Sequence, residues 1–220
     1  MELKEYQRRV IERYDDYLTA LYTQRQNSEK AVAALKAAGV DIPEGTEDWP
    51  KGAWGELKKQ NILPRFKGPQ GFIIPDYTAR HDSLQRSIPH VCLKVPTGGG
   101  KTLLATECIG RTHTDFFKRQ TGLVLWIVPT VQIYRQTWKA LADRQHPYRQ
   151  TLERASGGRV KVLEKDDAFN QADVDNYLCV MLVRLAATNR SNNKEFLKIF
   201  RDAGKYTSFF PELDDYNANN

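Results

Sequence analysis

The stretch KVPTGGGKTLL, from Lys94 to Leu104, contains the glycine-rich turn that decides the fold of this chain. An apolar run, HVCLKV, precedes the turn, and a helix-like segment, KTLLATECIGRTH, follows it. Consecutive backbone amides in such a turn can wrap around phosphate groups because no side chain intervenes, and the N-terminus of the next helix adds its dipole. A glycine turn between a strand and a helix therefore predicts a phosphate-binding site in an α/β fold.

Two side chains complete the turn with a cation and a hydroxyl. Lys101 would place its charge on the outer phosphates of a nucleotide, and Thr102 would supply an oxygen ligand to Mg²⁺. Val95 stands where the general G-x-x-x-x-G-K-T formula has its first glycine. The predicted nucleotide site consists of Thr97, Gly98, Gly99, Gly100, Lys101 and Thr102, with Lys101 as the catalytic residue. The alternative interpretation is a glycine turn in a domain that binds no nucleotide.

Short apolar runs alternate with helical segments after Pro89. The strand candidates are HVCLKV before the turn, LVLWIV ending at Val128, RVKVL ending at Leu163 and YLCVMLV ending at Val183. The last of them is an apolar run typical of a buried central strand, and VQIYRQTWKALADR reads as a helix. This alternation predicts a parallel sheet covered by helices. The tail from Asn192 adds one predicted helix, KEFLKIFRDAG, and the acidic PELDDYNANN.

The first 89 residues have a different texture. Apolar residues spaced by three and four positions from Tyr6 to Leu21 predict a long amphipathic helix. A second helix is expected from Ser28, as N-cap, to a stop at Gly39. Six of the ten prolines fall between Pro43 and Pro89, so this part is expected to be loop with one short helix around Trp54, docked through its tryptophans.

Composition limits the possible classes of protein. The chain has 33 Lys and Arg against 27 Asp and Glu, a net charge of +6, which favours polyanionic partners without requiring them. Cys92, Cys108 and Cys179 stand apart in apolar surroundings and are expected to be reduced core thiols. The charged start MELKEYQRRV is no signal peptide, and no run approaches about 18 apolar residues, so a cytoplasmic protein without a membrane partner is expected.

Two segments resemble helicase motifs. PTGGGKT is similar to motif I of superfamily 2 helicases and translocases, in which a small apolar residue commonly replaces the first glycine. PTVQIYRQ, from Pro129 to Gln136, resembles motif Ia of the same superfamily and would start a helix after a strand. Thr130, Arg135 and Gln136 are therefore expected to contact a DNA backbone. The alternative is that Pro-Thr only begins a helix and Gln136 is an ordinary exposed residue.

A third segment, LKEYQ, resembles the L-x-x-Y-Q element that precedes motif I in this superfamily. The resemblance implies that the amide of Gln7 pairs with the adenine edge and makes the site prefer ATP. Tyr6 has an alternative role in the core packing of the first helix.

Together these segments resemble the N-terminal part of the Res subunit, the helicase-type subunit of type III restriction enzymes in the DEAD/DEAH superfamily. The resemblance implies a partial RecA-like P-loop NTPase domain over residues 90–205, preceded by N-terminal helices and a Pro/Trp-rich insert over 1–89 and followed by an acidic loop or truncated tail over 206–220. It also implies ATP and Mg²⁺ as ligands, ATP-dependent translocation on duplex DNA, and a modification (methyltransferase) subunit as partner.

The sequence departs from that family in its acidic residues. No apolar strand ending in Asp-Glu follows Thr102, and Asp214 and Asp215 read as surface loop. Without this pair, the arginine finger and the second lobe, we expect nucleotide binding without turnover, as in the front part of a helicase lobe. One alternative is a stand-alone, non-catalytic nucleotide- or DNA-binding module. Another is a P-loop kinase or other NTPase unrelated to helicases, which would make the matches to motif Ia and LKEYQ coincidences.

Overall fold

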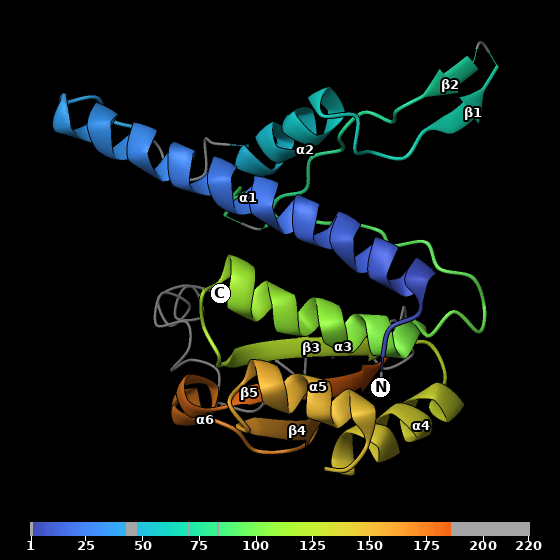
Figure 1. Ribbon diagram of the computed structural model, residues 1–220. Helices are drawn as coiled ribbons and strands as arrows, with labels where there is room; N and C mark the ends of the chain where they lie inside the picture. The colour runs from blue at the N-terminus through green and yellow to red at the C-terminus, as the bar shows by residue number, and fades with distance from the viewer. Residues whose placement is uncertain (1, 43–47, 70, 83, 186–220) are drawn as a thin grey trace, which may run out of the picture. The chain divides into compact units, whose positions relative to one another are not determined.

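The computed structural model of the chain describes residues 2–42, 48–69, 71–82 and 84–185 (Figure 1). These residues form two compact units, one from Glu2 to Gly100 and one that begins at Lys101.

Helix α1 (Glu5–Ala37) dominates the first unit. Its buried face carries Ile11, Tyr14 and Leu21, as the spacing of apolar residues predicts, and Gly39 follows its end with φ +81°. The prediction of a second helix starting at Ser28 is wrong, because α1 runs on through this residue. No helix breaker separates the two segments, and the Arg25–Glu29 ion pair of 2.7 Å spans the expected boundary. No helix in the described ranges has an apolar stretch that could cross a membrane.

The proline-rich part contains the predicted short helix, α2 (Trp49–Lys59), which packs on α1 through Ala53 and Leu57. Asp48 caps this helix by accepting a hydrogen bond from the amide of Lys51. The sequence did not predict the antiparallel hairpin that follows, formed by β1 (Phe66–Gly68) and β2 (Gly71–Ile73).

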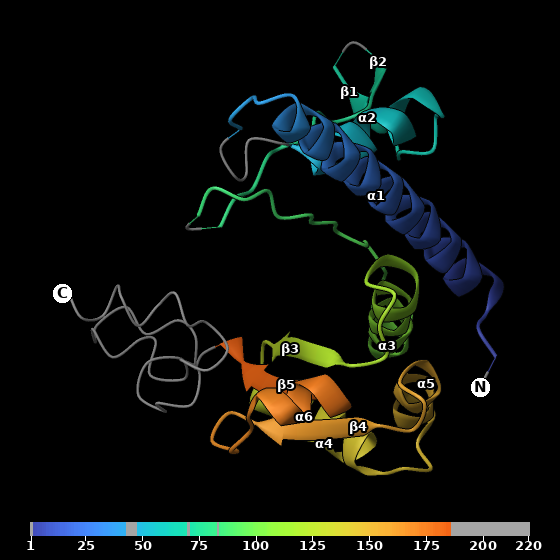
Figure 2. The same cartoon turned by 90° about the vertical axis from the view of Figure 1, so that its left-hand side faces the viewer.

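The second unit is built on a parallel sheet in the order β3-β5-β4, formed by β3 (Gly122–Val128), β4 (Val160–Glu164) and β5 (Leu178–Arg184) (Figure 2). This arrangement confirms the predicted α/β class with a parallel sheet. It also confirms the central strand, because every residue of β5 from Leu178 to Val183 is at most 2% exposed. An apolar run without polar alternation is what a strand covered on both faces requires.

Helices cover the two faces of this sheet unequally. Residues of α3 (Lys101–Arg111), α4 (Val131–Ala142) and α5 (Pro147–Ala155) pack with Leu178 and Val180 on one face. The short α6 (Gln171–Asn176) and Phe169 pack on the other, against Cys179 and Met181. A π-helical turn, Thr112–Phe116, extends α3.

Some sequence predictions are not met. Residues 90–95 were expected to form a strand, but neither sheet of the described chain includes them. A strand requires hydrogen-bonding neighbours, and an apolar run alone does not provide them. Cys92 is exposed, so its assignment as a core thiol is wrong, whereas Cys179 is buried and its burial raises its pKa to about 11. The predicted tail helix and acidic loop lie outside the described residues.

Arg149 joins three elements of the second unit. Its buried guanidinium donates hydrogen bonds to the carbonyls of Leu141 at 3.0 Å and Val160 at 2.9 Å, and its Nε donates to Glu153 at 3.0 Å. The two carbonyls lie at the end of α4 and the start of β4. Arg144 also pairs with Glu153, but its side chain is 70% exposed. Glu153 therefore has one buried arginine partner, which also binds two carbonyls, and one exposed arginine partner.

Arg149→Ala is expected to lower the free energy of unfolding by about 3 kcal/mol, because it leaves buried carbonyls and Glu153 without their donor. Arg144→Ala, which removes only the exposed partner, should cost less than about 1 kcal/mol. Urea denaturation of both variants measures the difference. Equal losses of unfolding free energy in the two variants would show that the buried hydrogen bonds of Arg149 add no more stability than the exposed ion pair of Arg144.

Candidate nucleotide and nucleic-acid sites

The glycine turn in the first unit adopts a backbone that only glycine tolerates. Gly98 and Gly100 have φ angles of +77° and +78°. A Cβ on Gly99 would lie 2.6 Å from Cγ1 of Val95 and 2.9 Å from the carbonyl oxygen of Pro96. The turn closes by a hydrogen bond from the amide of Gly99 to the same carbonyl, at 3.0 Å. The loop is therefore a narrow backbone cradle without side chains, the form that suits a phosphate chain.

Two side chains from the start of α1 hold this cradle. The hydroxyl of Tyr6 and Nε2 of Gln7 each donate a hydrogen bond to the carbonyl of Gly99, both at 3.1 Å. Oε1 of Gln7 accepts from the amide of Lys4 at 2.9 Å, and Gln7 is only 5% exposed. A Cβ on Gly100 would collide with Nε2 of Gln7. Gln7, which the sequence suggested as an adenine contact, thus fixes the loop itself in this structure.

Lys101 and Thr102 open helix α3 in the second unit. Lys101 is exposed and Thr102 is half-buried. Both line a cavity of about 610 Å³ that also borders the carboxyl end of β3 and one side of α4. Its remaining lining residues include Trp126, Pro129, Ile133, Gln136, His146 and Tyr148. The structure therefore brings the predicted phosphate-binding and Mg²⁺-binding side chains together with Gln136.

The residues predicted to contact DNA do not share one site. Thr130 is the N-cap of α4, and its hydroxyl oxygen accepts a hydrogen bond from the amide of Ile133 at 3.2 Å. Gln136 lines the cavity beside Lys101, whereas Arg135 lines a second cavity of about 510 Å³. Consecutive residues on a helix point about 100° apart, which separates the two side chains.

The second cavity gathers basic and aromatic side chains at the carboxyl ends of β4 and β5. Its lining comprises Val131, Tyr134, Arg135 and Trp138 from α4, with Glu164, Lys165 and Arg184. Three of these residues are cations and one is an acid. The acid is engaged, because Glu164 accepts a hydrogen bond from the hydroxyl of Tyr134 at 2.8 Å. Burial and this bond to Glu164 raise the pKa of Tyr134 to about 12.

Sequence reasoning missed Tyr134, Trp138, Lys165 and Arg184. Lys165 and Arg184 could have been found, because they lie one or two positions after the ends of two predicted strands. Parallel strands bring their carboxyl ends to one edge of a sheet. No cluster of three or more His, Cys, Asp or Glu residues suited to a metal occurs in the described ranges. Asp214 and Asp215 lie outside them.

Gln7→Glu is expected to loosen the glycine turn. A carboxylate can still accept from the amide of Lys4, but it cannot donate to Gly99 and places negative charge beside a carbonyl oxygen. Losing this buried bond should cost about 1–3 kcal/mol and speed hydrogen exchange of the Gly98–Gly100 amides about tenfold or more. Asn27→Asp, which also converts an amide to a carboxylate but at an exposed position of α1, is the control. Unchanged exchange in Gln7→Glu would refute the role of Gln7 in the loop.

Comparison with known proteins assigns the chain to one family. The family model described as type III restriction enzyme, res subunit, matches residues 1–203. No curated protein and no solved structure matches the chain. The matched range includes Gln7, the glycine turn and the whole parallel sheet, which accordingly forms part of a RecA-like α/β domain with a superfamily 2, helicase-like function. The chain belongs to the res subunit family of type III restriction enzymes.

Proposed function

We propose that the turn from Thr97 to Thr102 binds ATP with Mg²⁺. The observation that carries this proposal is the cradle itself, in which two glycines have positive φ and the third has no room for a Cβ. Helix α3 begins directly after it, so its first amides and dipole favour an anionic ligand. Lys101 would meet the outer phosphates, and the hydroxyl of Thr102 would bind Mg²⁺, which neutralises phosphate charge when bound.

Gln7 remains our proposed adenine contact, in addition to its bonds within the chain. A primary amide has two N–H donors and an oxygen with two lone pairs. Gly99 uses one donor and Lys4 uses one lone pair. One donor and one acceptor site therefore remain for a base edge. Because Gln7 also bonds to Gly99, binding of the base would act directly on the glycine turn.

We further propose that DNA phosphates bind at the basic cavity lined by Arg135, Lys165 and Arg184. Arginine and lysine are the main partners of phosphate oxygens in protein–DNA contacts, and they position the duplex without reading its sequence. Thr130, at the N-terminus of α4, would add its hydroxyl to the same backbone. Gln136 faces the cavity beside Lys101, so its proposed role shifts from DNA toward the nucleotide.

Helix α4 lines both cavities, which supports a mechanism of coupling. Gln136 borders the cavity that contains Lys101 and Thr102, and Arg135 borders the basic cavity. A shift of this one helix on ATP binding would therefore move a DNA contact. Translocation on duplex DNA driven by ATP hydrolysis, with a modification subunit as partner, is the activity that we propose for res subunits that contain this region.

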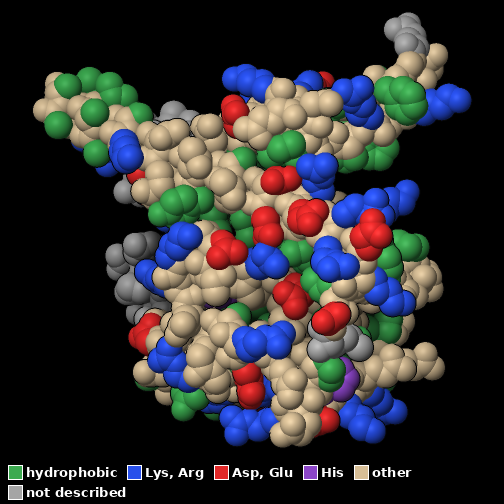
Figure 3. Space-filling view, in the orientation of Figure 1, with side chains coloured by type: hydrophobic (Ala, Val, Ile, Leu, Met, Phe, Trp, Pro, Cys, Tyr) green, Lys and Arg blue, Asp and Glu red, His purple; other side chains and the backbone are tan. Residues whose placement is uncertain are grey.

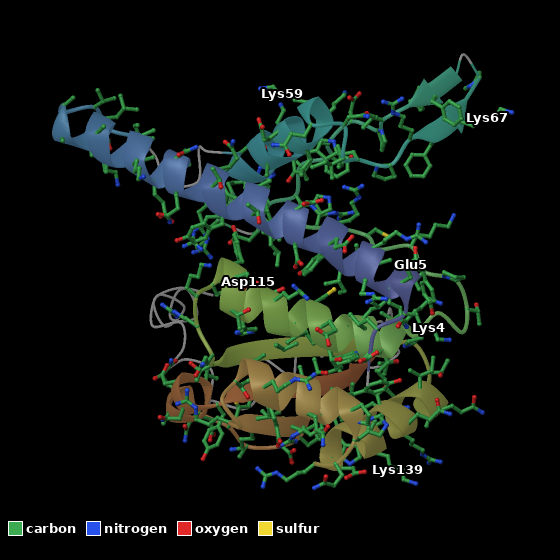
Figure 4. All side chains as sticks on the ribbon, viewed as in Figure 1. Lys4, Glu5, Lys59, Lys67, Asp115 and Lys139 are labelled. Atoms are coloured by element: carbon green, nitrogen blue, oxygen red, sulfur yellow. The ribbon has the colours of Figure 1, made fainter. Side chains whose placement is uncertain are left out.

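Lys101→Ala is expected to weaken Mg²⁺-ATP binding by about tenfold or more, because it removes a charge-assisted contact to phosphate. Lys139→Ala, at an exposed lysine of α4 that lines neither cavity, should leave the affinity unchanged (Figure 4). Isothermal titration calorimetry measures both. Equal binding by wild type and Lys101→Ala would contradict the nucleotide site. No Asp-Glu dipeptide follows Thr102 in the sequence, so ATP hydrolysis by this chain should not exceed that of buffer. Strong DNA-stimulated turnover would contradict this expectation.

Arg184→Glu is expected to lower the affinity for blunt duplex DNA by about tenfold and to reduce the salt dependence of binding by roughly one phosphate contact. Lys139→Glu makes the same charge change outside the basic cavity and should have a smaller effect. Fluorescence anisotropy at several salt concentrations measures both quantities. If the two variants lose equal affinity, binding depends on net charge alone and the cavity is not the DNA site.

A further inference from the structure

The hairpin formed by β1 and β2 exposes apolar side chains to solvent. Phe66 is 51% exposed, Phe72 73% and Ile73 54%. Figure 3 shows hydrophobic and basic side chains together on this hairpin. A two-stranded hairpin without a buried face gains little stability from such residues. These exposed apolar residues therefore indicate a binding surface rather than a contribution to the stability of the fold.

The register of the hairpin pairs an aromatic ring with a cation. Phe66 lies opposite Ile73, and Lys67 lies opposite Phe72. Residues directly opposite each other in an antiparallel pair project from the same face. One face of the hairpin therefore carries Phe66 and Ile73, and the other carries Phe72 and Lys67 at directly opposite positions. Lys67 forms no ion pair within the described ranges and is labelled in Figure 4.

The surrounding charge favours a polyanion. No Asp or Glu occurs from Leu57 to Pro75, whereas this stretch contains Lys58, Lys59, Arg65 and Lys67. Lys58 pairs with Asp76, just beyond the stretch, at 3.3 Å. A purely apolar partner would leave the charges around Phe72 poorly solvated. Nucleic acid satisfies both features at once, because its bases stack on aromatic rings and its phosphates pair with cations.

The base of the hairpin is held in place. Nε1 of Trp54, on α2, donates a hydrogen bond to the carbonyl of Pro75 at 3.1 Å. The rings of Trp54 and Tyr77 have centroids 6.3 Å apart. These contacts fix the chain that returns from β2 to the helical part of the unit. The hairpin is thus anchored at its base while Phe72 stays exposed.

We propose that the hairpin binds an unpaired DNA base, stacked on Phe72, with Lys67 on a neighbouring phosphate. A base inside a duplex has both π-faces covered, so stacking requires a single strand, a frayed end or a fork. The proposal rests on the DNA binding proposed above and adds a preference for unpaired DNA. It assigns this contact to residues that lie in a different compact unit from the basic cavity.

The test compares a forked DNA with two single-stranded tails and a blunt duplex of equal length, both by fluorescence anisotropy. Wild type should prefer the fork, and Phe72→Ala should weaken fork binding by about tenfold while changing blunt-duplex binding little. Phe72→Trp should retain the preference, and Phe72→Leu should lose it, because leucine is apolar but has no π-face. Leu84→Ala, at another exposed apolar residue of the same unit, is the matched control.

The outcomes separate this proposal from the general DNA-binding proposal. If Phe72→Ala or Phe72→Leu binds the fork as wild type does, the stacking site is refuted, and retention by leucine would indicate an apolar protein surface instead. The basic cavity would still stand if Arg184→Glu lowers duplex affinity in the same assay. If wild type binds neither DNA, both proposals are overturned.

Discussion

The burial of β5 between β3 and β4 is the constraint on which the second unit depends. The strand is covered on both faces and paired on both edges, so its apolar residues have no alternative register that keeps them out of water. Its two neighbours are parallel to it, and their carboxyl ends consequently meet at one edge. That edge carries both cavities. Lys101 and Thr102 line one of them, and Arg184 and Lys165 line the other.

A different constraint organises the first unit. The carbonyl of Gly99 is held by Tyr6 and Gln7, which are adjacent in the sequence but lie more than ninety positions from it. These contacts fix the glycine turn from within the chain, so part of the entropy cost of the proposed phosphate binding would already be met by folding. The same contact explains why Gln7 is buried although glutamine is usually exposed. A base-recognition residue that also fixes the phosphate loop would link the two ends of a nucleotide.

The binding proposals place different chemistry in different elements. The glycine turn offers backbone amides, the basic cavity offers side-chain cations, and the hairpin offers an exposed aromatic ring beside a lysine. Helix α4, with Gln136 facing one cavity and Arg135 the other, is the element best placed to connect nucleotide and DNA. Leu123, Leu125 and Ile127 of β3 lie on the same face as Cys179, Met181 and Val183 of β5, the face on which α6 and Phe169 pack. Each of the three is 43–45% exposed, although their partners in β5 are buried.

The sequence by itself determined the features that depend on local chemistry. The glycine turn, the stop at Gly39, the helix that starts after Pro129-Thr130 and the apolar run of β5 each follow from the residues present, because backbone conformation and helix starts are decided within a few positions. The tertiary structure alone decided which segments meet. Residues 90–95 are mostly apolar yet form no strand, since a strand depends on hydrogen-bonding neighbours. Helix α1 continues through Ser28 because a possible cap does not break a helix. Likewise, Arg135 lines the same cavity as Arg184 and a different one from Gln136, because of helix geometry and strand order, which no local pattern contains.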